Sequence, residues 1–411
     1  MRLLLALTTL LMLGMACYGL VRMPAPTARK VWTVSLLLVL GNGTAMLSAH
    51  AFIAKWGFLG DSPRNGLIPL IDGTAYRPFV YRRLSFAAVR IVSDEIARRL
   101  PASLIEGLVH SPLSRYWKAG ALWTPREAIA FHVAYVFLWL ALCGTLMAFA
   151  GLVRASCRLS WTEAIAVATL AIALYPLSLV NGGYLYDATE ILLCSTLTLV
   201  ALVGPIPVVP VLFLLMMANK ESALLFLPGI IPILSRRVGL FRALRWVAPT
   251  AALGLCWLLW VRHRFAYSPG ESVENWFWYN LGFWTDLRNY FKFDRLFSPW
   301  LLAPRGANVL ILLFLAIPLR FGWPHLRSDL RWAFGGIAAV LLPLFIRSGL
   351  GDEVRGLALL VPFLLITVTL GARALSASTD GQRTMAVGLL EGREPSSRAD
   401  TCAAEGPSPP N

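Results

Sequence analysis

The chain alternates long apolar segments with short polar ones over most of its length. Many of the apolar segments approach roughly 20 residues, the length that a helix needs to cross about 30 Å of hydrocarbon. The pattern predicts an all-α fold, a polytopic integral membrane helical bundle of about eleven transmembrane segments. These segments lie at 3–21, 31–54, 128–153, 162–180, 188–203, 206–218, 222–234, 247–262, 307–319, 332–347 and 355–372.

Composition narrows the class of protein further. Hydrophobic residues make up 57% of the 411 residues and charged residues 14%, against roughly 25% charged residues in a soluble domain. This excludes an ordinary water-soluble enzyme, a disordered protein and a disulfide scaffold. The 6 cysteines form no CxxC or other metal-binding spacing, so neither a disulfide framework nor a zinc site is predicted. The sequence has no Walker A loop, GxSxG elbow, HExxH or Rossmann glycine pattern. ATP-driven transport, serine hydrolysis and zinc proteolysis therefore have no support.

The basic residues predict how the bundle is oriented. The net charge is +15, and in a membrane protein such an excess favours short cytoplasmic loops over nucleic acid as its explanation. Alternate loops carry 12 Lys and Arg residues on one side of the membrane and 3 in the short loops on the other. The positive-inside rule therefore predicts an external N-terminus and a cytoplasmic C-terminus. The loops on the basic side are 22–30, 154–161, 204–205 (which has no Lys or Arg), 235–246 and 320–331, and the others are 181–187, 219–221 and 347–355.

The chain divides into three regions. Residues 1–30 are predicted to form an extra N-terminal helix, retained rather than cleaved as a signal peptide, and a cytoplasmic loop. Residues 31–372 form the transmembrane domain, with long outer loops at 55–127 and 263–306. The tail 373–411 is rich in Ser, Pro, Gly and charge, and is predicted to be disordered and cytoplasmic.

Both outer loops are predicted to contain helices that lie along the membrane surface. In loop 263–306, 12 of the 34 residues from Tyr267 to Trp300 are aromatic. That density is typical of an interfacial belt, with contacts to a lipid tail or stacking on sugar rings as the alternative. In loop 55–127, a helical pattern places apolar and charged residues on opposite faces, with Val89, Val92, Ile96 and Leu100 on the first and Arg90, Asp94 and Arg98 on the second.

The stretch 206–234 allows two interpretations. One long helix would bury Asn219, Lys220 and Glu221 at bilayer depth, where charges are costly, and would turn the basic loop 235–246 outward. Two short helices that meet at an outer turn avoid both problems and are predicted here. The short segments 188–203 and 206–218 form either two full crossings or one shallow hairpin.

Most polar clusters near the predicted span ends fall on the outer face. Carboxylates and cations that converge at one boundary of the membrane form a candidate site for a charged substrate, because burying them is costly unless they pair or bind something. The clusters are Asp61, Asp72, the run YRPFVYRRL at 76–84, Asp187 and Glu190 in NGGYLYDATE, Lys220 and Glu221 in NKES, and Asp352, Glu353 and Arg355 in GDEVRG.

Each cluster also has a purely structural interpretation. Asp61 and Asp72 lie beside glycines, as turn residues do. The arginines of YRPFVYRRL could anchor to lipid headgroups. Asp187 and Glu190 could cap the helix that follows them, and Lys220 with Glu221 could form a structural ion pair.

The elements YRPFVYRRL, YDATE and NKES, together with the span pattern of 31–372, resemble the C-type (GT-C) glycosyltransferases and related bacterial membrane proteins. The segment 31–54 and loop 55–127 resemble the first helix and first outer loop of that family. The resemblance implies a bacterial cytoplasmic (inner) membrane location and transfer of a sugar from a polyprenyl-phosphate donor to an acceptor on the outer face. The chain departs from the family in one respect, because no Asp-Glu or Asp-Asp pair follows segment 31–54.

The resemblance assigns roles to particular residues. Sugar transfer needs a carboxylate base for the acceptor hydroxyl and cations for the departing phosphate. Asp61 is the first choice for the base and Asp72 the second. The implied phosphate ligands are Arg77 and Arg82, with Lys220 or Arg355 completing the positive site. The secondary candidates, of which the first two could hold a divalent metal, are Asp187, Glu190 and Glu221.

Two other functions remain open. A transporter or flippase for an amphipathic anion would use the same outer arginines, but it needs a polar path through the bundle. The interiors of segments 128–153, 247–262 and 332–347 contain no Asp, Glu, Lys or Arg, which favours a one-sided site. A structural membrane subunit without a site is the other alternative. The expected partners are the lipid bilayer and, for the enzyme, a lipid-linked sugar donor, without nucleic acid.

Overall fold

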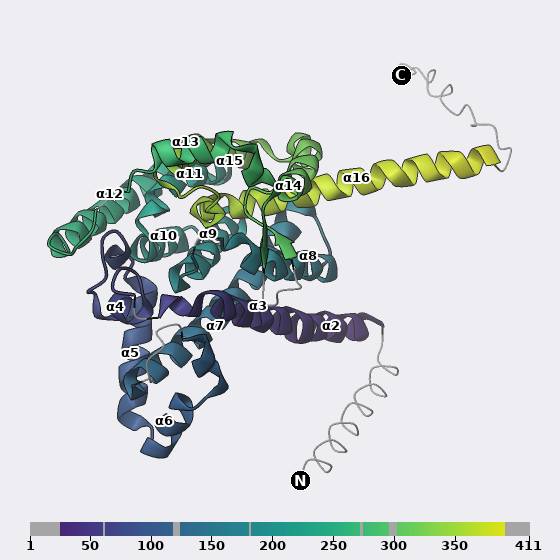
Figure 1. The fold of residues 1–411 in the computed structure, drawn as a ribbon. Coiled ribbons are helices and arrows are strands. Elements are labelled where there is room, and N and C mark those ends of the chain that lie inside the picture. The colour runs from purple at the N-terminus through teal and green to yellow at the C-terminus, as the bar shows by residue number, and fades with distance from the viewer. Residues whose placement is uncertain are drawn as a thin grey trace, which may run out of the picture.

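The computed structural model describes residues 25–60, 62–117, 124–180, 182–271, 274–295 and 302–390. The described chain is a bundle of helices with one small two-stranded antiparallel sheet in the loop between α13 and α14 (Figure 1). Asp61, the first predicted segment at 3–21 and the end of the tail at 391–411 lie outside these residues. The α-helices are α2 (Ala25–Ser35), α3 (Asn42–Trp56), α4 (Leu67–Asp72), α5 (Leu84–Arg99), α6 (Ala102–Val109), α7 (Pro125–Cys157), α8 (Trp161–Leu174), α9 (Leu185–Val203), α10 (Val208–Asn219), α11 (Leu227–Val238), α12 (Leu240–Arg264), α13 (Phe277–Thr285), α14 (Val309–Gly322), α15 (Ser328–Ser348) and α16 (Val361–Leu390).

Short helical turns and the two strands connect these helices. Residues Leu36–Gly41 form a π-helical turn, η1, between α2 and α3. The 3-10 turns are η2 (Gly57–Leu59), η3 (Phe79–Tyr81), η4 (Pro112–Tyr116), η5 (Tyr175–Ser178), η6 (Glu221–Phe226), η7 (Leu287–Phe291), η8 (Trp323–His325) and η9 (Val354–Leu360), and the strands are β1 (Phe293–Arg295) and β2 (Leu302–Pro304).

The structure confirms a membrane-type helical bundle, but not eleven crossings. Within the described residues, 7 helical stretches are long and apolar enough to cross a membrane, and two shorter apolar helices accompany them. The predicted segment 222–234 is divided between η6 and α11, which is 12 residues long. The spans are Lys30–Leu59, Pro125–Cys157, Trp161–Ser178, Leu185–Val203, Leu240–Arg264, Ser328–Ser348 and Val354–Ala377, and the shorter helices are Val208–Asn219 and Val309–His325.

The longest span, α7, lies at the centre of the bundle. It packs against α3, α5, α6, α8, α9 and α16, and much of its length is buried. Its first turn is closed by a capping box, in which the Thr124 hydroxyl accepts from the Glu127 N–H and the Glu127 carboxylate accepts from the Thr124 N–H. Such reciprocal bonds satisfy N–H groups that the helix itself leaves without partners.

The predicted break within 206–234 is confirmed. α10 ends at Asn219, and Lys220 adopts an extended conformation with φ −159° and ψ 134° before η6 begins. Ile206, just before α10, and Val238, at the end of α11, line one pocket, so the two helices form a hairpin with Lys220 at its turn. The break lets the charged side chains leave the apolar layer.

Contacts between loops show which helix ends lie together. Arg237 at the end of α11 donates to the Ala201 carbonyl oxygen at 2.8 Å, at the C-terminal end of α9. Arg236 pairs with Asp329 at the start of α15, with 3.4 Å between nitrogen and oxygen. The connection after α9 and the basic connections after α11 and α14 therefore meet at one end of the bundle, as the charge pattern predicts.

The helix predicted in loop 55–127 forms as α5, but its buried face differs from the predicted stripe. Val89 is fully buried, whereas Val92 is 37% exposed and the polar Ser93 is only 6% exposed. α5 packs on α4, α7 and α9. Contact with other helices, rather than with the membrane surface alone, therefore decides which face is covered.

The first part of the tail that was predicted to be disordered is helical in the structure. α16 continues through Leu390 and extends away from the bundle (Figure 1). Half of residues 373–390 are Ala, Leu, Arg or Met, which are good helix formers and favour continuation of the preceding span.

Two glycines allow α14 and α16 to cross closely. A Cβ at Gly322 would lie 1.9 Å from the Thr367 carbonyl oxygen, and a Cβ at Gly371 would lie 1.9 Å from the Pro318 carbonyl oxygen. Small residues let membrane helices bring their backbones together and gain packing contacts. A side chain at either position would require the two backbones to separate.

Gly371→Ala is accordingly expected to destabilise the protein. The added methyl group meets backbone that cannot rotate aside, and such overpacking typically costs about 1–3 kcal/mol. The melting temperature of the purified protein in detergent measures the effect. The matched control is Gly335→Ala in α15, where a Cβ meets no atom within 4 Å and alanine should be neutral or slightly stabilising. Equal melting temperatures for the two variants would contradict the close crossing.

Candidate functional site

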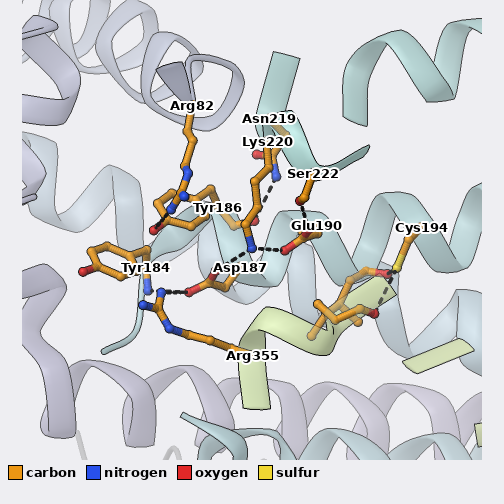
Figure 2. A network of polar contacts seen from close by, with 12 residues as sticks. Arg82, Tyr184, Tyr186, Asp187, Glu190, Cys194, Asn219, Lys220, Ser222 and Arg355 are labelled. Carbon is orange, nitrogen blue, oxygen red and sulfur yellow. Dashed lines mark hydrogen bonds and ion pairs between the residues drawn. The ribbon is translucent and has the colours of Figure 1, made fainter. Parts of the chain in front are cut away.

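Seven charged side chains meet at the end of the bundle opposite to the basic loops. They come from four segments that are distant in the sequence, and Figure 2 shows most of them around the start of α9. We call this set the charged cluster. Its members are Arg82 before α5, Asp187 and Glu190 on α9, Lys220 and Glu221 at the α10–η6 turn, and Glu353 and Arg355 at the start of η9.

The start of α9 places the two acids of the charged cluster. Gly182 has φ +146°, and a Cβ at Gly183 would lie 2.6 Å from the Trp56 ring, so this approach to the helix requires residues without side chains. The Asp187 carboxylate accepts the Tyr184 N–H at 3.2 Å. Asp187 therefore caps α9, as predicted from the sequence. Its carboxylate also contacts Lys220 and Arg355.

Asp187 and Glu190 share Lys220 between them. The Lys220 ammonium lies 2.6 Å from a Glu190 oxygen and 3.7 Å from an Asp187 oxygen. Glu190 also accepts from the Ser222 hydroxyl at 2.9 Å, and Asp187 accepts from Arg355 at 2.9 Å. Each acid thus has at least one cation, which offsets part of the cost of burying its charge.

Arg82 lies on the other side of the charged cluster and pairs with Glu221 at 3.2 Å. It also donates to the Tyr186 hydroxyl. Burial lowers the pKa of the Arg82 guanidinium, but the charges of Glu221 and Asp187 raise it more, so the pKa lies above its ordinary value. Arg82 therefore stays charged at any physiological pH.

Two tyrosines connect the arginines in a stack. Tyr184 and Tyr186 lie with ring centroids 4.9 Å apart and planes 8° apart. The Arg355 guanidinium lies 4.5 Å from the Tyr184 centroid, and that of Arg82 lies 4.4 Å from the Tyr186 centroid. The order is arginine, tyrosine, tyrosine, arginine, and the attraction between each cation and its ring holds both guanidinium groups in place.

Neutral polar groups fix the backbone around this stack. Asn219 donates to the Tyr186 carbonyl oxygen at 2.9 Å and accepts from the Ser85 hydroxyl at 2.8 Å. Asn65 donates to the Tyr184 hydroxyl at 2.7 Å. The segment after Gly60 is therefore attached to the charged cluster through Asn65.

The charged cluster contains one more carboxylate than cations, since four acids face three basic groups. The acids differ in access to solvent. The side chains of Asp187 and Glu190 are 1% and 4% exposed, whereas those of Glu221 and Glu353 are 24% and 16% exposed. Glu221 and Glu353 are thus the carboxylates that an incoming anion could displace most readily.

An apolar cavity of about 300 Å³ adjoins the charged cluster. It is lined by α7, α8, η5, α9, α14 and α16 residues that are nearly all hydrocarbon. Ile191 lines it and lies one helical turn beyond Asp187, on the same face of α9. Tyr175 lines it as well, and its buried hydroxyl has no hydrogen-bond partner among the described residues, although Asp187 and Arg355 act on it electrostatically. Ile191 and Tyr175 therefore place one part of the cavity near the start of α9, although no member of the charged cluster lines it.

The structure distributes the predicted site residues unevenly. It brings together Arg82, Lys220, Arg355, Asp187, Glu190 and Glu221. Asp72 ends α4 and pairs with Arg126 at the start of α7, so its described contact lies outside the charged cluster. The Arg77 backbone N–H donates to the Pro269 carbonyl oxygen at 2.8 Å, in the aromatic outer loop. Asp61 lies outside the described residues. Its neighbours Gly60 and Ser62 belong to the segment that Asn65 connects to Tyr184.

Sequence reasoning missed three members of the site. No role was predicted from the sequence for Tyr184 and Tyr186, although both lie in the NGGYLYDATE element. Their spacing of two residues next to Asp187 was the one feature of the sequence that could have indicated them. Tyr175 gave none, because a single tyrosine at the end of an apolar run is common at membrane boundaries. Asp352 was grouped with Glu353 and Arg355, but it pairs with Arg305 at 3.3 Å instead.

A divalent metal does not fit the described part of the site. Within the described ranges, no group of three His, Cys, Asp or Glu side chains lies close enough together to hold an ion. Asp187 and Glu190, which could hold a metal in the sequence interpretation, face Lys220 and Arg355 instead. A site already filled by cations repels a further one.

No family model, curated protein or solved structure matches this chain. Its function is therefore inferred from the geometry of the charged cluster, the tyrosine stack and the cavity. Together they can hold a molecule with a charged head and a long apolar chain, because the two environments lie side by side.

Proposed function

We propose that this protein is a membrane glycosyltransferase that moves a sugar from a polyprenyl-phosphate donor to an acceptor at the outer face of the membrane. The observation that carries the proposal is that the charged cluster lies close to the apolar cavity, whose lining residues Ile191 and Tyr175 neighbour Asp187 and Glu190. A polyprenyl phosphate has a hydrocarbon chain suited to the cavity and a phosphate suited to arginine. The resemblance to GT-C glycosyltransferases points to the same substrate class.

In this proposal the donor phosphate binds to Arg82, and Arg355, on the far side of the tyrosine stack, adds longer-range attraction. The phosphate displaces Glu221, the carboxylate that pairs with Arg82, and leaves the buried pairs of Asp187 and Glu190 with Lys220 in place. The tyrosine stack keeps the two guanidinium groups oriented during this exchange. Arginine suits the role because its planar fork can contact two phosphate oxygens at once.

Transfer then requires one bond to form and one to break. The acceptor hydroxyl oxygen attacks the anomeric carbon while the bond between that carbon and the phosphate oxygen breaks. A carboxylate removes the hydroxyl proton, and we assign this role to Asp61, with Asp72 as the second choice. The phosphate leaves with the bonding electron pair, and Arg82 stabilises its charge. The orientation of this end toward the outside follows from the positive-inside rule, since the basic loops meet at the opposite end.

The proposal is tested with the full-length protein in sealed proteoliposomes that contain a polyprenyl-phosphate hexose labelled in the sugar. Membrane lipid extract serves as the source of acceptor. We expect the label to move to a new product and polyprenyl phosphate to accumulate, both detected by mass spectrometry. If the donor instead crosses the bilayer with its sugar still attached, the protein is a flippase and the proposal is wrong.

A further inference from the structure

A second pocket lies at the basic end of the bundle, opposite to the charged cluster. It has a volume of about 520 Å³ and is lined by Ile206, Val238, Arg242, Arg245 and Trp246. Ile206 and Val238 belong to the ends of the α10–α11 hairpin, and the other three belong to the first turns of α12. Arg242 and Arg245 are three residues apart, so both side chains point to the same side of α12.

The two arginines of this pocket have no acidic partner among the described residues. Neither forms an ion pair, unlike Arg236, which pairs with Asp329, and Arg237, which donates to the end of α9. The sequence contains no Asp or Glu from Ser222 to Gly270. The pocket therefore carries positive charge that the described residues do not neutralise.

The surroundings place this charge at a boundary between water and hydrocarbon. Next to the arginines, Phe241 is 88% exposed, Leu240 52% and Trp246 39%. Such large apolar side chains are costly in water and are typical of helix ends that lie in the membrane interface, where tryptophan also accumulates. A ligand that satisfies both features must combine a negative group with hydrocarbon.

We propose that the pocket formed by Arg242, Arg245 and Trp246 binds the headgroup phosphate of an anionic phospholipid. The two guanidinium groups contact the phosphate oxygens, and the acyl chains pass along Ile206, Val238 and the exposed apolar residues of α12. Basic pockets between membrane helices suit such headgroups, because each arginine near the surface adds attraction. This inference is independent of sugar transfer, since the pocket shares no residue with the charged cluster.

The test uses native mass spectrometry of the full-length protein in detergent with equimolar phosphatidylglycerol and phosphatidylcholine. We expect the wild type to retain phosphatidylglycerol preferentially and Arg242→Gln/Arg245→Gln to lose roughly tenfold or more of that preference. Both residues are exposed, so the variant should fold, which its melting temperature verifies. The matched control is Arg262→Gln/Arg264→Gln, which removes the same charge from the other end of α12 and should keep the preference.

Three results would overturn the proposal. The first is an unchanged preference in the Arg242→Gln/Arg245→Gln variant. The second is an equal loss in the Arg262→Gln/Arg264→Gln control, which would mean that total charge alone attracts the lipid. The third concerns the source of the phosphate. If inorganic phosphate raises the melting temperature of the wild type as much as phosphatidylglycerol does, and fails to do so in the variant, the site binds a free anion.

Discussion

Asp187→Asn is expected to destabilise the folded protein by about 3–5 kcal/mol, the usual cost of removing one partner from a buried ion pair. Asp187 is 1% exposed and faces both Arg355 and Lys220. The amide cannot neutralise either cation, although its oxygen can still accept the Tyr184 N–H at the start of α9. The change therefore removes a counter-ion from two buried cations and weakens the contacts that hold Arg355 on the tyrosine stack.

Thermal unfolding of the purified protein in nanodiscs measures this change. The matched control is Asp286→Asn in the loop between α13 and α14. Its partner Arg288 has an 88% exposed side chain, so this change should leave the melting temperature almost unchanged. Asp187→Asn combined with Arg355→Gln should cost less than the sum of the two single changes, because the double variant leaves no unpaired charge in that pair. A melting temperature for Asp187→Asn equal to that of the control would show that the charged cluster does not hold the bundle together.

The hydrophobic pattern predicted the class of fold well, because the bilayer allows few alternatives for an apolar chain. It also predicted the break at Lys220, since a lysine and a glutamate at mid-span would be costly. The periodicity of α5 was right, but its buried face was not. Ser93 faces α7 while Val92 faces outward, and only the position of the neighbouring helices decides this.

The charged cluster could be anticipated in part for a similar reason. Four of its members were grouped from the sequence because each lies near the end of a span at the predicted outer face; they are Arg82, Glu190, Lys220 and Arg355. Which residues pair could not be predicted, because partners such as Asp72 and Arg126 lie 54 positions apart and depend on how α4 meets α7. The stacking of Tyr184 on Tyr186 likewise depends on the turn that begins α9 rather than on residue type.

Asp61→Asn and Arg82→Lys are expected to abolish sugar transfer while the protein still folds. Removing a positioned general base usually lowers the rate about 100- to 10,000-fold, whereas removing a turn aspartate costs stability of the order of 1 kcal/mol. Lysine at position 82 keeps the positive charge but loses the planar fork that pairs with Glu221 and, in this proposal, with phosphate. Arg82→Lys therefore separates phosphate recognition from simple attraction of an anion.

The matched controls are Asp286→Asn and Arg288→Lys, which make the same chemical changes in an exposed ion pair of the outer loop. Both controls should keep the activity of the wild type, and the melting temperatures of all four variants should stay close to it. If Asp72→Asn abolishes sugar transfer while Asp61→Asn remains fully active, the general base is Asp72 rather than Asp61.

The most direct measurement is the rate at which polyprenyl phosphate is released from its labelled sugar donor by wild type, Asp61→Asn and Arg82→Lys in the same proteoliposomes. The proposed mechanism predicts acceptor-dependent release by the wild type and a loss of about 100-fold or more in both variants. Release at the wild-type rate by both folded variants would contradict the proposal that Asp61 and Arg82 act in one site.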